Sequence, residues 1–290
     1  MIKNQILVFI IIGFSGIINA QKEVFFFQTN WGFNQQIETF VKKAKTSGYD
    51  GVEIWAPKDS IKQIEISNIL NNYNMKVIFL CGSDPSLTFK KSLDEYEKYL
   101  KNTLELRPIA VNSHTGSDFY NFNQNMAFLE LAEKLSNEYK IPVYHETHRG
   151  RFSYSIPETI RYLEKKETLN LTLDISHWIV VHESLLDNRE EFLKKIIQRS
   201  NHIHARVGFE EGPQINDPSA PEWEKVIERH LDIWEAVIQK TWNENKSATI
   251  TTEFGPPGYM PTLPFTQKPV SDQWNANVFI MNKLKKRIKE

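Results

Sequence analysis

The residues of this sequence that could do chemistry are acidic and imidazole side chains, each at the end of a short apolar run. Glu146 ends the run in "IPVYHETHRGR", and three later runs lead to Asp174, His204 and Glu253. Any one of these alone could be a partner in a structural ion pair. Together, three carboxylates would repel one another and need a positive counter-charge. Oxygen donors with one imidazole suit Mn²⁺, Co²⁺, Mg²⁺ or Zn²⁺, so we predict a divalent metal site.

These four side chains can meet only if the chain brings the ends of their runs together. Apolar runs typical of strands alternate eight times with longer segments of helical spacing. Such alternation predicts right-handed crossovers and a parallel sheet. Eight units fit an α/β fold, the closed (β/α)₈ TIM barrel, in which the carboxyl ends of all strands meet at one mouth. A doubly wound open sheet is the alternative, although no G-x-G-x-x-G loop follows the first strand.

The first twenty residues, "MIKNQILVFIIIGFSGIINA", predict export. Lys3 precedes an apolar run and Ala20 ends the segment, which is the pattern of a secretory signal peptide. An uncleaved anchor is the alternative, but the run is short for a membrane span of about 20 residues. We therefore predict a signal peptide over residues 1–20 and one barrel domain over residues 21–290. The mature protein would be periplasmic or secreted, without stable membrane insertion.

The charge balance argues against a nucleic-acid partner. The chain has 35 Lys and Arg against 36 Asp and Glu, a formal net charge of -1. Binding to DNA or RNA needs a basic face, for which this composition has no excess of positive charge. An apurinic endonuclease built on the same barrel would also need more histidine ligands for several zinc ions. We therefore expect a small-molecule partner, and export favours a sugar or keto-sugar over a sugar phosphate.

Four motifs resemble the xylose isomerase-like sugar isomerase/epimerase family, in particular its ketose 3-epimerases. The motifs are "VYHETHRGR", "LTLDISHW", "NHIHARVG" and "TITTEFGP". The resemblance implies that one divalent metal is held by four residues: Glu146, Asp174, His204 and Glu253. It also implies that His177, three residues after the aspartate, contacts the substrate. A homodimer would fit the same resemblance.

The residues around the expected metal site depart from those of the epimerases. Phe152 stands where the epimerases carry a second glutamate, and Glu210 stands where they carry an arginine. The sugar specificity of the family therefore does not transfer to this chain. Polar and aromatic residues near the strand ends give further candidates for substrate contact: His148, Arg206, His114 and Trp31. Trp31 follows the first strand and could stack on the face of a sugar.

The resemblance implies a metal-dependent sugar isomerase/epimerase that acts through an enediolate intermediate. Glu146 and Glu253 would remove and return a C–H proton from opposite sides of the sugar. The family also includes dehydratases of cyclic polyols and lyases that act on 3-keto-glycosides. A lyase or dehydratase of keto-sugars or 3-keto-glycosides is therefore the alternative, since the same enediolate can expel an oxygen substituent from the next carbon. A non-catalytic carbohydrate-binding barrel is a third alternative, although it would not need four ligands from four strands.

Overall fold

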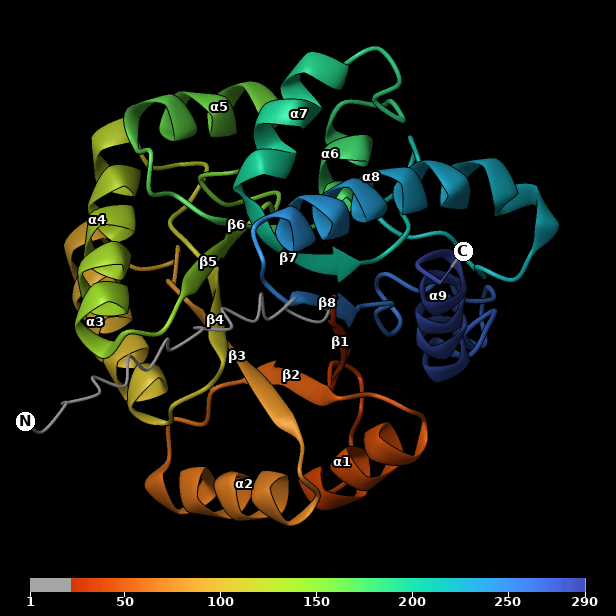
Figure 1. Cartoon of the computed structure of the whole chain (residues 1–290), viewed down its shortest axis with the longest axis horizontal. Helices are drawn as coiled ribbons and strands as arrows, with labels where there is room; N and C mark the ends of the chain where they lie inside the picture. The colour runs from red at the N-terminus through yellow and green to blue at the C-terminus, as the bar shows by residue number, and fades with distance from the viewer. Residues whose placement is uncertain (1–21, 290) are drawn as a thin grey trace, which may run out of the picture.

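The apolar runs of the sequence form parallel strands that close into a barrel (Figure 1). The computed structural model describes residues 22–289, so the predicted signal peptide lies outside the described residues and stays a prediction. Each strand pairs with the next and β8 pairs with β1, in the order β1 (Val24–Thr29), β2 (Gly51–Trp55), β3 (Lys76–Gly82), β4 (Ala110–His114), β5 (Val143–Glu146), β6 (Leu171–Leu173), β7 (Ser200–Ala205) and β8 (Ala248–Thr252). The predicted TIM barrel is confirmed, and the open doubly wound sheet is wrong.

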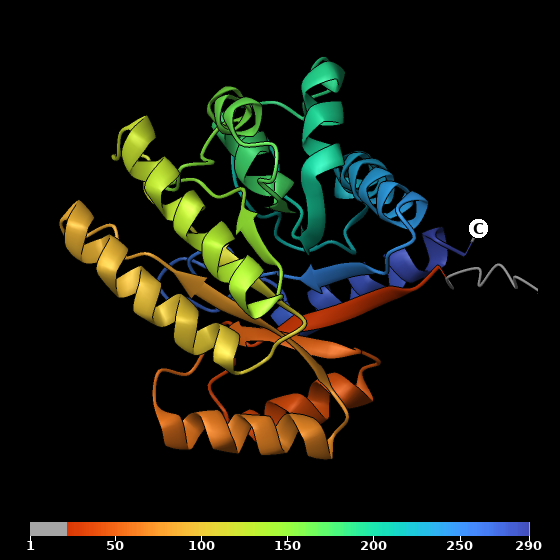
Figure 2. The same ribbon diagram turned by 60° about the vertical axis from the view of Figure 1, so that its left-hand side comes forward.

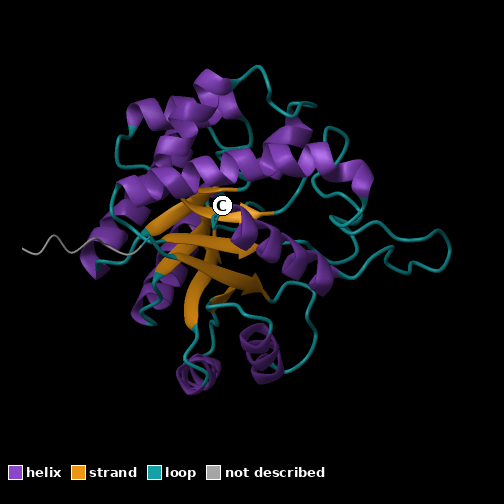
Figure 3. Ribbon diagram, turned by 45° about the vertical axis from the view of Figure 1, so that its right-hand side comes forward, coloured by secondary structure: helices purple, strands orange, loops and turns teal. Residues whose placement is uncertain are grey.

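Helices follow the strands and surround the barrel, as Figures 2 and 3 show. They are α1 (Ile37–Thr46), α2 (Ser60–Asn72), α3 (Phe89–Glu105), α4 (Phe122–Tyr139), α5 (Ile156–Lys165), α6 (Ile175–Val181), α7 (Glu190–Arg199), the 3₁₀ turn η1 (Pro221–Trp223), α8 (Glu224–Asn243) and α9 (Gln273–Arg287). Over residues 22–289, none of these helices has the length and apolar character that crossing a membrane requires.

Side-chain caps fix where several of these helices begin. Asp59 accepts a hydrogen bond from the backbone of Lys62 at the start of α2. Asn121 and Gln124 form a reciprocal capping box at the start of α4, and Asp272 caps α9. Each cap of this kind stabilises a helix by about 1 kcal/mol, because it satisfies backbone N–H groups that have no partner inside the helix.

The inside of the barrel is apolar toward the amino ends of the strands and polar toward their carboxyl ends. Phe27, Ile78 and Ala110 form a buried cluster with the partly buried Tyr144, and we call these four residues the barrel floor. Gly51 makes room for Phe27, because a Cβ at position 51 would lie only 2.3 Å from the Phe27 ring. The polar site described below therefore rests on a packed apolar base.

A buried histidine ties α8 to the segment that follows β7. His230 Nε2 accepts a hydrogen bond from the backbone N–H of Gly208 at 3.1 Å, and Nδ1 lies 2.8 Å from the Val226 carbonyl oxygen, to which it donates. Both contacts are satisfied by the neutral ring. Burial lowers the pKa of His230 from its usual 6.5 to about 4, so the folded protein resists protonation there.

We expect His230 to make the fold less stable in mild acid. The unfolded chain binds a proton below about pH 6.5, whereas the folded chain binds one only near pH 4, so stability is lost as the pH falls between these values. At pH 4.5 the loss from this group should be about 2–3 kcal/mol. Urea unfolding of the wild type and of His230→Gln at pH 7.5 and pH 4.5 measures this loss. Between the two pH values, the free energy of unfolding should fall by that much less in His230→Gln than in the wild type. Equal losses in the two proteins would contradict the assignment.

Candidate metal and substrate site

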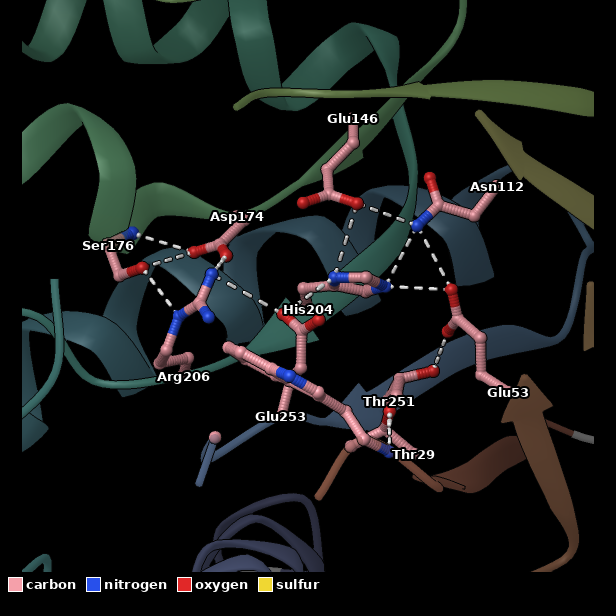
Figure 4. Close-up of polar contacts among 12 residues, drawn as sticks. Thr29, Glu53, Asn112, Glu146, Asp174, Ser176, His204, Arg206, Thr251 and Glu253 are labelled. Carbon is pink, nitrogen blue, oxygen red and sulfur yellow. Dashed lines mark hydrogen bonds and ion pairs between the residues drawn. The ribbon is translucent and has the colours of Figure 1, made fainter. Parts of the chain in front are cut away.

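The four side chains predicted as metal ligands meet at the carboxyl end of the barrel (Figure 4). Glu146 ends β5, Asp174 directly follows β6, His204 lies near the end of β7, and Glu253 directly follows β8. One ligand atom from each lies within 4.8 Å of the others, and all four residues are buried. The barrel therefore brings them close enough to share one cation.

Asp174 is fixed by both the end of β5 and the start of α6. Its Oδ1 accepts hydrogen bonds from the Ser176 backbone N–H at 3.0 Å and from Ser176 Oγ at 2.6 Å. Its own backbone donates to Thr147 Oγ1 at 2.8 Å, and that hydroxyl donates back to the Asp174 carbonyl at 2.9 Å. Burial, reinforced by the neighbouring carboxylates, raises the pKa of Asp174 to about 6 against the opposing effect of Arg206. The site thus fixes this carboxylate where its negative charge is disfavoured, and a cation bound beside it would stabilise that charge.

A polar layer beneath His204 fixes the orientation of its ring. Glu53 Oε1 accepts hydrogen bonds from His204 Nε2 at 2.9 Å and from Asn112 Nδ2 at 3.0 Å, while Glu53 Oε2 lies 3.0 Å from His202 Nε2. Burial opposes ionisation of Glu53, but the imidazoles of His204 and His202 hold its pKa below the usual range. Because Nε2 is bonded to Glu53, His204 presents Nδ1 to the other candidate ligands.

Two buried atoms of the cluster form no hydrogen bond with any residue of the described chain. These are His204 Nδ1 and Glu253 Oε2, which lie 2.9 Å apart without hydrogen-bond geometry. Burial opposes a charge on His204, but Glu253, Glu53 and Glu146 raise its pKa well above the usual value. Imidazole nitrogen and carboxylate oxygen gathered in one buried cluster form a donor set that divalent metals bind in proteins. The residues present therefore fit a metal ion.

Arg206 adds a buried positive charge to the cluster. Its Nη2 forms an ion pair with Asp174 Oδ2 and lies 3.5 Å from Glu253 Oε2. Its Nε donates to Ser176 Oγ at 3.1 Å. Burial works against the charge, but Asp174 and Glu253 outweigh it and raise the pKa of Arg206 above its usual value. The guanidinium thus offsets part of the negative charge that the three carboxylates bring into the barrel.

His177 lies fully buried beside Arg206 rather than on an open surface. Its Nε2 is 2.9 Å from Arg206 Nη2 and 3.6 Å from Asp174 Oδ2. The side chain is not part of the cavity wall described next. Its predicted contact with a substrate stays a prediction.

A cavity of about 230 Å³, which we call the site cavity, opens over the cluster. Two of the four candidate ligands, Glu146 and Glu253, line it. Most of the predicted substrate-contact residues line it as well: His114, His148, Arg206 and Trp31. Tyr259, from the loop after β8, completes the wall, with its ring 4.5 Å from the Arg206 guanidinium carbon and 4.9 Å from the Trp31 ring.

Three residues of the site were not among those predicted. Glu53 and Asn112 face into the barrel, and Asn112 Nδ2 also donates to Glu146 Oε2 at 2.9 Å. Strand alternation does place both toward the barrel axis, Glu53 with Trp55 and Asn112 with His114, but it does not distinguish a contact to a metal ligand from a structural ion pair. Tyr259 could not be placed in this way, because it lies in a loop whose path the sequence does not specify.

A family model matches residues 41–239, which is more than half of the chain, and it describes a xylose isomerase-like TIM barrel. The chain belongs to this family. Among curated protein sequences, none matches this xylose isomerase-like barrel significantly.

Solved structures similar to this xylose isomerase-like barrel include three enzymes. The 3-keto-D-glucoside 4-epimerase YcjR from E. coli is 14% identical, with a TM-score of 0.61 over 91% of this chain and 100% of that one. An L-ribulose 3-epimerase is 10% identical, with a TM-score of 0.61 over 91% and 95%. The probable 3-DHS dehydratase AsbF from Bacillus anthracis is 13% identical, with a TM-score of 0.55 over 90% and 98%. At these identities the likeness shows the shared fold.

We expect Glu53→Gln to weaken metal binding by this xylose isomerase-like barrel by about 10–100-fold, because the partner that orients His204 loses its charge. Calorimetric titration of the metal-free protein with Mn²⁺ at pH 7.5 measures the Kd. Tyr49→Phe is the matched control, since it removes a buried hydrogen bond to Thr252, 2.8 Å long, without touching His204. An unchanged Kd in Glu53→Gln would show that Glu53, in the polar layer beneath His204, does not position His204 as a metal ligand.

Proposed function

We propose that this protein is a divalent-metal-dependent isomerase or epimerase of sugars or keto-sugars that works in the periplasm or outside the cell. The observation that carries the proposal is the buried meeting of Glu146, Asp174, His204 and Glu253 under the site cavity, with His204 Nδ1 and Glu253 Oε2 lacking hydrogen-bond partners within residues 22–289. Membership of the xylose isomerase-like family and the sugar epimerases among the similar structures support the choice of reaction.

The four ligand candidates divide into two pairs by their exposure to the cavity. Asp174 and His204 lie behind the cavity wall, whereas Glu146 and Glu253 form part of it. A divalent cation held by these four residues would polarise a sugar carbonyl and the neighbouring hydroxyl, and so acidify the C–H bond between them. Glu146 and Glu253 are then the two carboxylates that can reach that proton, one to remove it and one to return it.

Glu146 has the ionisation state that a base requires. Its Oε2 lies 2.8 Å from His114 Nε2 and accepts a hydrogen bond from Asn112 Nδ2. Burial opposes ionisation, but His114 and His204 outweigh it and hold the pKa of Glu146 well below the usual value. A carboxylate that stays ionised at neutral pH can accept a proton without prior activation.

The same proton removal would lead to elimination if the next carbon carries an oxygen substituent. The electron pair of the broken C–H bond then forms a C=C bond as the C–O bond breaks. A lyase or dehydratase acting on keto-sugars or 3-keto-glycosides is therefore the alternative outcome, and only the products distinguish it from an epimerase.

The test is metal analysis of the purified mature protein, followed by proton–deuterium exchange in D₂O with free ketoses and 3-keto-glucosides as probes. We expect about one divalent ion per chain and deuterium incorporation beside the carbonyl that stops when EDTA removes the ion. Inverted configuration in the product indicates epimerisation, and cleavage indicates elimination. A metal-free protein that binds these sugars without exchange would make it a carbohydrate-binding barrel and end the proposal.

A further inference from the structure

A second cavity opens beside the site cavity at the same end of the barrel. It has a volume of about 530 Å³, against about 230 Å³ for the site cavity, and we call it the outer cavity. It is formed by the ends of β2 and β3, the loops after β2, β3 and β5, and one residue of α3. The residues that matter here are Trp55, Lys58, Asp84, Tyr99 and Arg151. The outer cavity is open to solvent over most of its extent, and it is wide enough to receive a ligand group that extends from the smaller site cavity.

The two cavities share one lining residue. Trp55 lines both of them, and the residue is 47% exposed. Its ring meets the His114 ring edge-on, with 5.2 Å between the centroids, and His114 Nε2 lies 2.8 Å from Glu146 Oε2. Gly82 keeps this region open, because a Cβ there would lie 3.0 Å from His114 Cβ and 3.4 Å from the Trp55 ring. A group bound in the outer cavity therefore lies next to one bound over Glu146.

The outer cavity combines aromatic surface with charges of both signs. Lys58 Nζ lies 4.6 Å from the centre of the Tyr99 ring, and Asp84 is an exposed carboxylate whose pKa is lowered by hydrogen bonds from Ser86. The Arg151 guanidinium is anchored through Nη1, which donates to the carbonyl oxygens of Ser83 at 3.0 Å and Gly116 at 3.3 Å. The other two guanidinium nitrogens of Arg151 form no hydrogen bond within the described chain.

This composition matches the chemistry of a sugar ring. The C–H face of a pyranose is apolar and packs on an aromatic surface such as the exposed side of Trp55. Its hydroxyls both donate and accept, so they can pair with the Asp84 carboxylate and with the Lys58 and Arg151 cations. A fully ionised phosphate group only accepts hydrogen bonds, so it could pair with Lys58 and Arg151 but would be repelled by the ionised Asp84, whereas a sugar ring can pair with all three.

We propose that the outer cavity binds the second sugar ring of a glycoside, so that the substrate is a disaccharide-like keto-glycoside rather than a free monosaccharide. The proposal rests on the proposed function, which places the reacting ring over Glu146 and Glu253. The second ring then lies across Trp55, with its hydroxyls toward Lys58, Asp84 and Arg151.

The experiment compares two probes that share one keto ring: methyl 3-keto-β-D-glucoside and 3-ketocellobiose, which carries a second glucose instead of the methyl group. With the Mn²⁺-loaded mature protein in D₂O, we expect kcat/KM for exchange to be about tenfold or more higher for 3-ketocellobiose. Lys58→Ala and Asp84→Ala should each reduce the ratio of the two kcat/KM values about tenfold, because each loses a charged hydrogen-bond partner. Lys62→Ala, an exposed lysine of α2 outside both cavities, is the matched control and should leave the ratio unchanged.

Saturation-transfer NMR supplies a readout that does not depend on turnover. The second glucose of 3-ketocellobiose should receive magnetisation from the wild type and much less from Asp84→Ala. The outer-cavity proposal would be overturned by equal kcat/KM values for the two probes, or by a second ring that receives no magnetisation. In either case, exchange on both probes would still support the proposed function. The third probe is the 6-phosphate of the methyl 3-keto-glucoside. If its kcat/KM exceeds that of 3-ketocellobiose, and this advantage disappears in Lys58→Ala, the outer-cavity proposal would be overturned in favour of a sugar phosphate.

Discussion

Replacing Glu253 by glutamine should lower the rate of sugar proton exchange by about 10³-fold or more, with the fold preserved. Glu253 Oε2 lies 2.9 Å from His204 Nδ1 and lines the site cavity, so the carboxylate is both a candidate ligand and a candidate base. Glutamine keeps the shape of the side chain but can neither accept the proton nor bind a cation with comparable strength. Loss of the base should therefore appear mainly in kcat.

The measurement is deuterium exchange on the probe that the wild type accepts best, with Mn²⁺ in large excess so that weaker metal binding does not limit the rate. Thermal unfolding checks that the variant is folded. Glu211→Gln is the matched control, because Glu211 is exposed and lies outside the site. Exchange at more than a tenth of the wild-type rate would reject Glu253 as the base.

Replacing Arg206 by leucine should destabilise the metal-free protein by about 3–5 kcal/mol, because removing one partner of a buried ion pair leaves the other charge uncompensated. The guanidinium is almost completely buried and pairs with Asp174, which is itself fully buried. The guanidinium lowers the pKa of Asp174, so without it the buried carboxylate would stay charged without compensation or take up a proton at a cost. For a domain of this size, the melting temperature in EDTA should fall by roughly 10 °C.

If loss of the ion pair explains this destabilisation, removing both of its charges should be less harmful than removing one. Asp174→Asn together with Arg206→Leu removes both charges and should be more stable than Arg206→Leu alone. Arg161→Leu is the control for loss of a surface pair, since Arg161 is exposed and bonds Glu158 at 2.6 Å, and it should cost less than about 1 kcal/mol. A melting temperature for Arg206→Leu within a few degrees of the wild type would mean that the pair contributes little.

Much of the barrel could be predicted from the sequence because its strand pattern is regular. Alternation along a strand has a period of two, so placing Glu146 toward the barrel axis places His145 toward the helices. In the structure His145 Nδ1 lies 2.7 Å from Thr115 Oγ1, while Glu146 meets His204 and Asn112. Parallel strands in a barrel share one mouth, so four strand ends were enough to predict the cluster.

The rest of the site depends on contacts that strand alternation does not specify. That Arg206 turns onto Asp174, rather than into open solvent, depends on the depth of the cluster and the position of Ser176. Tyr259 reaches the site cavity through the loop after β8, and the outer cavity is formed by three separate loops together with the ends of β2 and β3 and one residue of α3. Loop paths follow from tertiary packing, so neither could be located from the spacing of residues.

The barrel floor would limit how a hydrogen abstracted in the proposed reaction can leave. Phe27, Ile78, Ala110 and Tyr144 pack beneath the polar layer, and the site cavity reaches Glu146 and Glu253 from the mouth of the barrel. The rings of Trp31 and Tyr259 narrow that mouth. If the proposed reaction takes a hydrogen from one face of a bound sugar, that hydrogen would leave past the ligand itself, which would favour its partial return to the same molecule over loss to bulk water. Isotopic label carried in by a substrate should accordingly be retained in part through a turnover.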